Sequence, residues 1–294
     1  MLCVGRFFVV LCGFFLIDAT LYAIKDDTIQ QEKPLENLSL DQIALLLSPK
    51  KTFKLYPYKA SYSIHPLHAD EKTSIDGKMD VSLERKEGVW SYKEDGQFFY
   101  IGNTGKIHQF QWAYQTQERL DGKVFSFDYS LQKDRKVVAN HKGRVEFDPL
   151  AKVGTVFWER PVKNTLTLYN KIIFPQALTA RLLKLIKQAP KLQSFYVFDG
   201  KNAGVLPLFS CFVDQPKKMP WSLGFSADSP ILHLVAWPVS QAMYREKYFC
   251  ERLAPTKEKF GLLSQGGVFL QKAMLFEGQK VLCALRSFKP LAPF

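Results

Sequence analysis

Cysteine and acidic residues are scarce in this chain. The first shortage limits the number of disulfides, and the second indicates which partners the protein can bind. The 294 residues include five cysteines, and two of them, Cys3 and Cys12, lie in the apolar N-terminal segment. The rest of the chain can therefore form at most one internal disulfide. Lys and Arg number 40 against 28 Asp and Glu, which gives a net charge of +12 and favours anionic partners. No nucleic-acid-binding motif accompanies this charge and the basic residues are spread along the chain, so we do not expect a nucleic-acid partner.

Long apolar runs are lacking after the first 23 residues. The later runs, near 205–213 and 231–239, are short and are interrupted by Pro207, His233 and Pro238. A helix needs about 20 apolar residues to cross the hydrocarbon core of a bilayer. We therefore expect no membrane-spanning helix in this part of the chain.

Residues 1–23 have the organisation of a secretory signal peptide. Arg6 is the single charge before an uninterrupted apolar run, Phe7–Ile17, and a more polar stretch leads to Ala23, the predicted cleavage residue. Leu21 fits poorly the preference for a small residue two positions before Ala23, so an uncleaved N-terminal anchor remains the alternative. We expect the chain to be exported.

The exported chain divides into three parts. Residues 24–54 are polar and mixed in charge, and a short helix is predicted within them, with Ser39 as its N-cap. Residues 55–290 are expected to form one large domain, and residues 291–294 a C-terminal tail. No repeat and no linker divides the large domain.

The large domain has the pattern of antiparallel β-strands. Apolar and polar residues alternate in Tyr56–Ile64 and in Phe125–Gln132, as expected of strands with one buried side. Asp121-Gly122 and similar Asp-Gly pairs mark hairpins between strands. Among the later strands, two are expected at 231–239 and 241–249.

One helix is predicted to interrupt these strands. Pro175 suits a first helical turn and Pro190 ends the segment. Its apolar face consists of Leu178, Leu182, Leu185, Ile186 and Ala189. We expect this face to pack into the hollow of the sheet; the alternative is a helix lying on an anionic membrane surface. The fold class is therefore mainly β, with a large curved or spiral antiparallel sheet, open and barrel-like, wrapped around one α-helix.

Several short motifs follow one another in a fixed order over about 55–290. They are Tyr58-Lys59-Ala60-x-Tyr62, Gly77-Lys78-Met79, Leu120–Phe127, Phe174-Pro175, Phe198-Asp199-Gly200 and Trp237-Pro238-Val239. This order resembles that of the EipB family, whose members are periplasmic proteins of cell-envelope integrity. The resemblance implies a spiral antiparallel sheet around a helix, located in the periplasm, and it carries over no catalytic residues.

The resemblance also implies a disulfide that this chain cannot form. In the family, a cysteine in an early strand pairs with one at the extreme C-terminus, whereas Lys86–Tyr92 and Lys289–Phe294 contain none here. Such a bond contributes about 2–4 kcal/mol. We expect the core, or a different bond between Cys211 and Cys250, to offset its absence. Cys283 lies in an apolar stretch and is expected to be a free, buried thiol.

His65 and His68 are the nearest approach to a metal site. Zinc needs three or four ligands, and no further cluster accompanies these two residues. We therefore expect no metal. No nucleophile motif or phosphate-binding loop occurs either, and we predict neither catalytic residues nor a cofactor.

These observations together predict a non-catalytic periplasmic protein that supports the integrity of a Gram-negative cell envelope. Its expected partner is an envelope lipid, a lipoprotein or a protein associated with the outer membrane, and an anionic envelope surface would suit its charge. Two alternatives remain: a periplasmic enzyme acting on cell-wall or lipid material, and a structural partner of an outer-membrane complex. The sequence leaves the oligomeric state open.

Overall fold

The computed structural model describes ten stretches of the chain. They are residues 54–67, 74–101, 105–148, 150–169, 172–201, 207–218, 235–245, 255, 257–276 and 279–291. Ala23, His68, Cys250 and the predicted N-terminal helix lie outside the described residues, so the predictions made for them stay predictions. Within these stretches no helix is long and apolar enough to cross a membrane.

The described chain is almost entirely β-structure, with one helix. The strands before the helix are β1 (Tyr58–Pro66), β2 (Ser74–Lys86), β3 (Val89–Ile101), β4 (Ile107–Arg119), β5 (Val124–Lys133), β6 (Lys136–Asp148), β7 (Val153–Arg160), β8 (Asn164–Tyr169) and β9 (Ile172–Ile173). The helix is α3 (Pro175–Ile186). The later strands are β10 (Lys191–Val197), β11 (Pro207–Val213), β12 (Lys217–Lys218), β13 (Val235–Arg245), β14 (Lys257–Leu263), β15 (Phe269–Phe276) and β16 (Gln279–Pro290).

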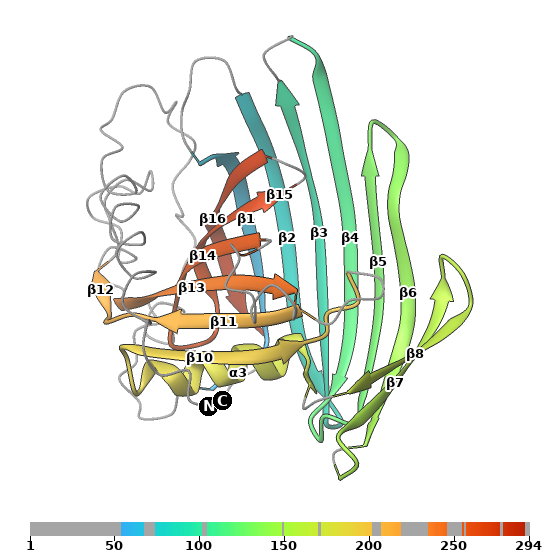
Figure 1. The fold of residues 1–294 in the computed structure, drawn as a ribbon. Coiled ribbons are helices and arrows are strands. Elements are labelled where there is room, and N and C mark those ends of the chain that lie inside the picture. The colour runs from blue at the N-terminus through green and yellow to red at the C-terminus, as the bar shows by residue number, and fades with distance from the viewer. Residues whose placement is uncertain are drawn as a thin grey trace, which may run out of the picture.

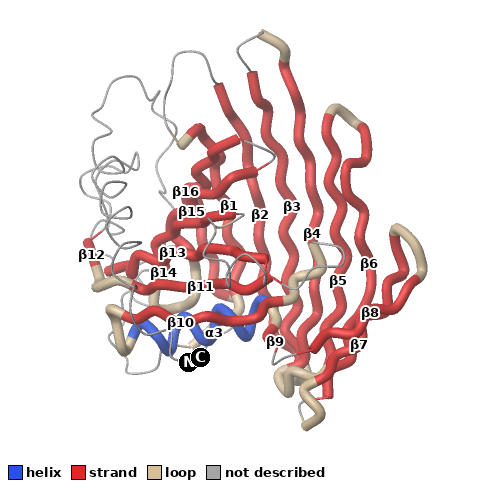
Figure 2. The backbone as a smooth tube through the Cα atoms, in the orientation of Figure 1, coloured by secondary structure: helices blue, strands red, loops and turns tan. Residues whose placement is uncertain are grey.

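The strands form one curved sheet, as the alternating pattern predicted. Its order is β8-β7-β6-β5-β4-β3-β2-β1-β16-β15-β14-β13-β11-β10-β9, with β12 beside β13. Neighbouring strands are antiparallel except β9 and β10. The edges, β8 and β9, are consecutive in the chain, so the middle of the sequence supplies both edges of the sheet. Figures 1 and 2 show the result: β2–β6 stand upright on one side and β10–β15 cross in front of them, which makes the sheet open and barrel-like.

The two halves of the sheet are joined where the chain begins and ends its β-structure. β1 pairs with β16 from Tyr58 opposite Pro290 to Pro66 opposite Val281, with a bulge between Ser61 and Tyr62. This ladder connects residues more than two hundred positions apart. The two halves are therefore held together without the disulfide that the resemblance implied.

Helix α3 lies on the inner side of the sheet. Its buried side chains include Leu182 and Leu183, which pack with Phe209 of β11, Trp237 of β13 and Leu263 of β14 in one apolar cluster. The predicted packing of the helix into the hollow is thus confirmed.

The helix is shorter than its apolar face suggested. It ends at Ile186 rather than Ala189. The next three amides donate to carbonyls three residues back, from Lys187 to Lys184, from Gln188 to Leu185 and from Ala189 to Ile186. The last turn is therefore tightened before Pro190, which cannot continue a helix.

The prediction of separate strands at 231–239 and 241–249 is wrong. Within the described residues, β13 runs without a break from Val235 to Arg245. Only Ser240 separates the two predicted strands, and the shortest hairpin connections have two residues. The continuous alternation of inner residues, Val239, Gln241 and Met243, belongs to one strand.

Candidate functional site

The loop that follows β10 enters the hollow. Phe198 is 2% exposed and packs against the rings of Phe127 and Trp158. The Tyr114 hydroxyl donates to the Asp199 carbonyl at 2.6 Å. Lys201 extends from this loop along the inner wall, where its Nζ lies 3.9 Å from the centre of the Tyr114 ring.

Glu94 of β3 is buried and accepts three hydrogen bonds. The donors are the Tyr92 hydroxyl at 2.6 Å, the Trp112 Nε1 at 2.9 Å and the Lys201 Nζ at 3.3 Å. Burial by itself would raise the pKa of Glu94. The charges of Lys201 and Lys272, and the hydrogen bonds from the Tyr92 hydroxyl and the Trp112 ring nitrogen, nevertheless hold this pKa well below its usual range. Glu94 is therefore an anion inside the sheet, and its oxygens are already occupied.

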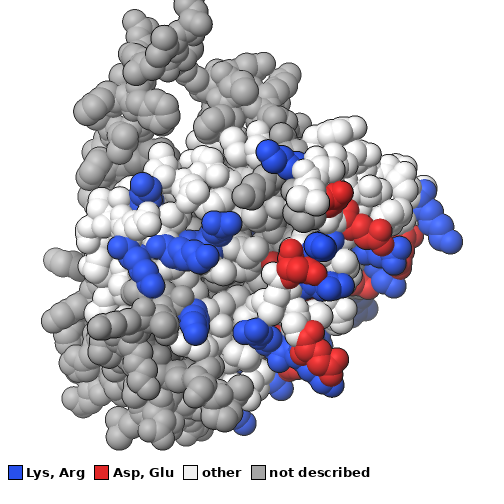
Figure 3. Space-filling view, turned by 90° about the horizontal axis from the view of Figure 1, so that it is seen from below, with Lys and Arg blue, Asp and Glu red and all other residues white. Residues whose placement is uncertain are grey.

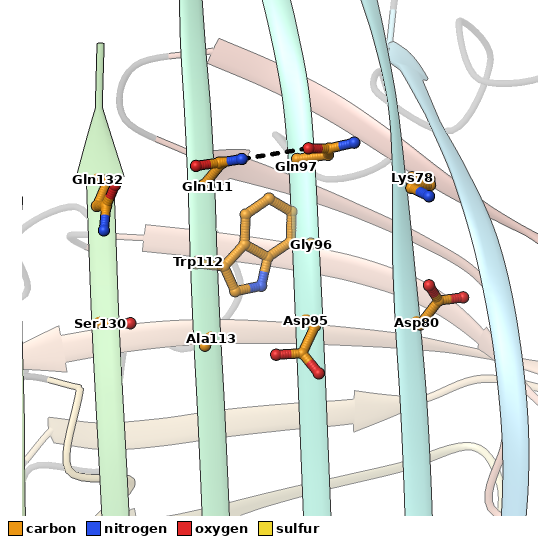
Figure 4. Close-up of a pocket in the computed structure, with 10 residues that line it drawn as sticks. All are labelled: Lys78, Asp80, Asp95, Gly96, Gln97, Gln111, Trp112, Ala113, Ser130 and Gln132. Carbon is orange, nitrogen blue, oxygen red and sulfur yellow. Dashed lines mark hydrogen bonds between the residues drawn. The ribbon is translucent and has the colours of Figure 1, made fainter. Parts of the chain in front are cut away.

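A glycine makes room for the ring that holds Glu94. Trp112 lies against the backbone of Gly96 (Figure 4), and a Cβ at position 96 would stand 2.1 Å from a ring atom. The outer side of the same strands carries a shallow groove of about 390 Å³. Side chains of both charges, such as Lys78 and Asp95, line it, so it selects no particular ligand class and is not our candidate site.

Lys259 of β14 and Lys272 of β15 add two amino groups to the inner side. Lys272 stands opposite Gly261 on β14 and opposite Cys283 on β16. Cys283 is 1% exposed and belongs to the core. Burial, followed by repulsion from Lys272 and Lys201, lowers the pKa of Lys259 to about 8. The hollow thus contains three ammonium groups, those of Lys201, Lys259 and Lys272.

Buried tyrosines complete this wall. Burial raises the pKa of Tyr62, Tyr92 and Tyr114, so all three are neutral hydrogen-bond donors at physiological pH. The Tyr62 hydroxyl donates to the Phe269 carbonyl at 2.9 Å. We define the interior cluster as Glu94, Lys201, Lys259, Lys272 and these tyrosines.

A second carboxylate inside the sheet has a structural task. Glu118 of β4 is 3% exposed, and its two oxygens accept the amides of Gln176 and Ala177 at 2.8 Å each. It caps the first turn of α3, whose N-cap residue Phe174 supplies no side-chain bond. Glu118 thereby ties the helix to the first half of the sheet.

The described cysteines have no reactive character. Burial raises the pKa of the Cys211 and Cys283 thiols to about 12, so both remain protonated. Neither forms a disulfide with another cysteine that the structure describes. Cys211 packs with the apolar side of α3, and its predicted bond to Cys250 stays a prediction because Cys250 lies outside the described residues.

His65 lies in a hydrogen-bonded group on β1 and β16. Its Nε2 is 2.8 Å from the Ser63 hydroxyl and 3.3 Å from an Arg286 guanidinium nitrogen, and the Arg286 Nε donates to Ser63 at 2.7 Å. His68, the other histidine considered as a metal ligand, lies outside the described residues. Over the described stretches no three potential ligands gather as a metal centre would require.

The outer side of α3 is strongly basic. Arg181, Lys184, Lys187 and, at the start of β10, Lys191 are all exposed. Figure 3 shows basic side chains gathered on the side of the molecule where α3 lies, with the acidic side chains of the described residues grouped elsewhere in this view. From Pro161 to Phe198 the sequence has six basic residues and no acidic one. The expectation of evenly spread charge is therefore wrong for this segment, and we name these four residues the basic face.

Sequence reasoning missed the interior cluster, although one signal for it was present. The inward positions of β3 are Trp90, Tyr92, Glu94, Gly96 and Phe98. Glu94 is therefore the one acidic residue among side chains that are aromatic or, at Gly96, absent. An acid at such a position indicates a buried partner. The identity of that partner, Lys201, depends on a loop from the other half of the chain.

Comparison with known proteins agrees with this architecture. The structure is similar to the crystal structure of a beta-barrel-like protein of a domain of unknown function from Brucella abortus, with a TM-score of 0.70. The two sequences are 18% identical, and the match covers 81% of this chain and 99% of the Brucella chain. At this identity the likeness concerns the fold. No curated protein matches the chain. The EipB-like family model matches residues 49–291, and the chain therefore belongs to the EipB-like family.

Proposed function

We propose that this protein is a non-catalytic component of the periplasm that supports the integrity of a Gram-negative cell envelope. In this proposal it attaches to an anionic envelope component, a lipid headgroup or the acidic surface of a lipoprotein, through the basic face. The arrangement of that face around α3 is the observation that carries the proposal. The signal-like segment 1–23 supports the location.

The basic face is held in one orientation. Leu182, Leu183 and Ile186 are fixed in the apolar cluster inside the sheet, so the helix cannot rotate about its axis without exposing them. Arg181 and Lys184, three residues apart, consequently point outward together. A fixed row of cations with no acidic residue among them attracts anionic surfaces.

The proposal is non-catalytic because the strongest candidate groups already have structural tasks. Glu94 is bonded by three donors and Glu118 caps α3. Nothing in the described residues favours the alternative of an envelope enzyme.

Neutralising part of the basic face should weaken binding to anionic vesicles. With Arg181→Gln and Lys184→Gln combined, we expect affinity for vesicles containing phosphatidylglycerol to fall by about 30-fold, because each basic residue near an anionic membrane contributes about 1 kcal/mol. Co-sedimentation with vesicles at increasing lipid concentration measures this.

The matched control replaces two basic residues that are already paired. Lys142 lies 2.8 Å from Glu159 and Arg144 lies 3.0 Å from Glu146 on an exposed part of β6 and β7. Lys142→Gln with Arg144→Gln should leave vesicle binding close to that of the wild type. Equal losses in the two double variants would mean that net charge rather than the basic face determines binding, and purely zwitterionic vesicles should bind neither protein.

Location is tested separately from binding. A fusion to a reporter enzyme that works only outside the cytoplasm should be active with the full-length chain and silent when residues 1–23 are deleted. Activity of the truncated fusion would contradict export through this segment.

A further inference from the structure

Three hydrogen-bond donors stand side by side on the inner surface of β13, β14 and β15. Gln241 is opposite Lys259 in the pairing of β13 and β14, and Lys272 is opposite Gly261, two residues further along β14. Side chains at alternate positions of a strand share one side, so all three project inward with Cys283. Each is half-buried. Among the described residues, none of the three side chains has a hydrogen-bond or ion-pair partner.

The carboxylates near these donors are already occupied. Glu94 accepts hydrogen bonds from Tyr92, Trp112 and Lys201, and it attracts Lys272 without a direct contact. The Asp199 carboxylate accepts the backbone amide of Lys201 at 2.9 Å. The positive charges of Lys259 and Lys272 therefore exceed the negative charge that the described residues provide.

Apolar side chains surround the two lysines. Met274 stands opposite Lys259, and the ring of Phe269 covers Gly261, because a Cβ there would lie 2.6 Å from that ring. Leu270, two residues before Lys272, belongs to the buried core. Charged nitrogens on an apolar wall suit a ligand with an anionic end and an apolar body.

We propose that Lys259 and Lys272, with the Gln241 amide, bind the oxyanion of an acidic ligand inside the hollow, either a phosphate or a carboxylate group. Two ammonium groups and one amide offer the donors that such an anion accepts. The site is distinct from the basic face, which lies on the outer side of α3. It does not depend on the proposed attachment to the envelope.

Electrostatics favour occupancy by an anion. Two like charges on a half-buried wall repel each other, and a bound anion would satisfy both. The lowered pKa of Lys259 reflects its burial first and then the repulsion from Lys272 and Lys201. Asp199 and Glu94 oppose this effect without removing it. Among the described residues, Tyr62 of β1 and Cys283 of β16 also face the site, and both are neutral.

The test measures binding of three probes to the full chain by calorimetry. The probes are inorganic phosphate, dihexanoyl phosphatidylglycerol below its micelle concentration, and octanoate. We expect at least one to bind, and Lys259→Met combined with Lys272→Met to weaken that binding by at least 30-fold. Binding of phosphate as tight as that of the lipid identifies a free anion as the ligand. Tighter binding of the lipid or of octanoate identifies an amphipathic acid with a phosphate or a carboxylate end.

Two controls separate a binding role from a structural one. Lys78→Met with Lys289→Met removes two exposed lysines from other parts of β2 and β16 and should leave binding unchanged. The Lys259/Lys272 variant should melt at the same temperature as the wild type or a few degrees higher, because it removes unpaired buried charge. Unchanged binding in this variant would overturn the proposal whatever its melting temperature, as would the absence of binding for all three probes to the wild type.

The pH dependence gives an independent readout. The phosphodiester of phosphatidylglycerol keeps its charge from pH 7 to pH 9, whereas Lys259, with a pKa of about 8, loses most of its charge over this interval. Affinity for this probe should fall about tenfold across the interval in the wild type, as expected for one titrating group. An affinity that stays constant would contradict a role for Lys259. The Arg181/Lys184 variant should retain this binding, so that failure of the envelope proposal and failure of this one remain distinguishable.

Discussion

Alanine in place of Gly200 should destabilise the protein by about 3–4 kcal/mol, the largest effect that we expect from a single small substitution. Gly200 has a φ of +73°, a conformation that a residue with a Cβ rarely adopts. A Cβ there would also lie 2.3 Å from Cγ of Phe127, which is 2% exposed within the aromatic core. The added methyl group must therefore displace either the loop that carries Lys201 or a ring that has little room to move.

Gly122→Ala separates the two contributions. Gly122 has a φ of +70° in the turn between β4 and β5, but no atom lies within 4 Å of the position that its Cβ would take. This variant should lose only about 1–2 kcal/mol, the cost of the backbone conformation. Unfolding of both variants in urea gives the two free energies of unfolding. Similar losses would show that the contact with Phe127 is unimportant and that backbone strain alone determines the effect.

Alanine in place of Glu118 should cost about 3 kcal/mol of folding free energy. The substitution leaves the buried amides of Gln176 and Ala177, in the first turn of α3, without an acceptor. The expected loss should appear in chemical unfolding of the whole domain, because α3 packs against strands of the second half. Glu146→Ala, which removes an exposed partner of Arg144, is the control and should change stability by less than about 0.5 kcal/mol.

Glu118 should also make stability depend on pH in a predictable direction. Burial raises the pKa of Glu118 to about 7, although its two backbone donors act to lower it. Below pH 4.5 the proton is bound in both the folded and the unfolded chain, and the stabilising contribution is fully present. It is lost as the pH rises towards 7, because the unfolded chain releases the proton first.

Glu118→Gln cannot titrate and isolates this effect. Between pH 4.5 and pH 7.5 the free energy of unfolding of the wild type should fall relative to that of the glutamine variant by about 1–3 kcal/mol. Urea unfolding of both proteins at several pH values measures the difference. Parallel pH profiles would falsify the assignment of Glu118 as a buried titrating group.

Several features of the fold were predictable because they depend on local pattern. Alternation in Phe125–Gln132 identifies a strand and the side of it that is buried, since successive side chains point to opposite sides. Pro175 and the leucines that follow it identify α3 and its apolar side, because side chains repeat every 3.6 residues around a helix. Membership of the EipB-like family was also predictable, because the resemblance consists of short sequence motifs in a fixed order.

Other features could not be read from local pattern because they depend on which segments meet. Alternation shows that Lys259 and Lys272 lie on the same side of their strands as apolar residues, but it does not reveal that Lys201 and Glu94 face them. That meeting requires β1 to pair with β16 and the Phe198–Lys201 loop to enter the hollow. Likewise the acceptor for the first amides of α3 is Glu118, more than fifty residues earlier in the chain.

The spacing of apolar residues along the chain was enough to predict most of the strands, the helix and the sides that they bury, although it divided β13 into two strands. The grouping of the charges depends instead on the tertiary fold, because it requires segments far apart in the sequence to meet. Because the sheet is curved, the inner residues of its two halves lie close together. Because the apolar side of α3 packs against the inner side of the sheet, Arg181 and Lys184 point outward. The composition gives only the total excess of positive charge. In the folded protein, part of this excess lies on the basic face and part in the interior cluster.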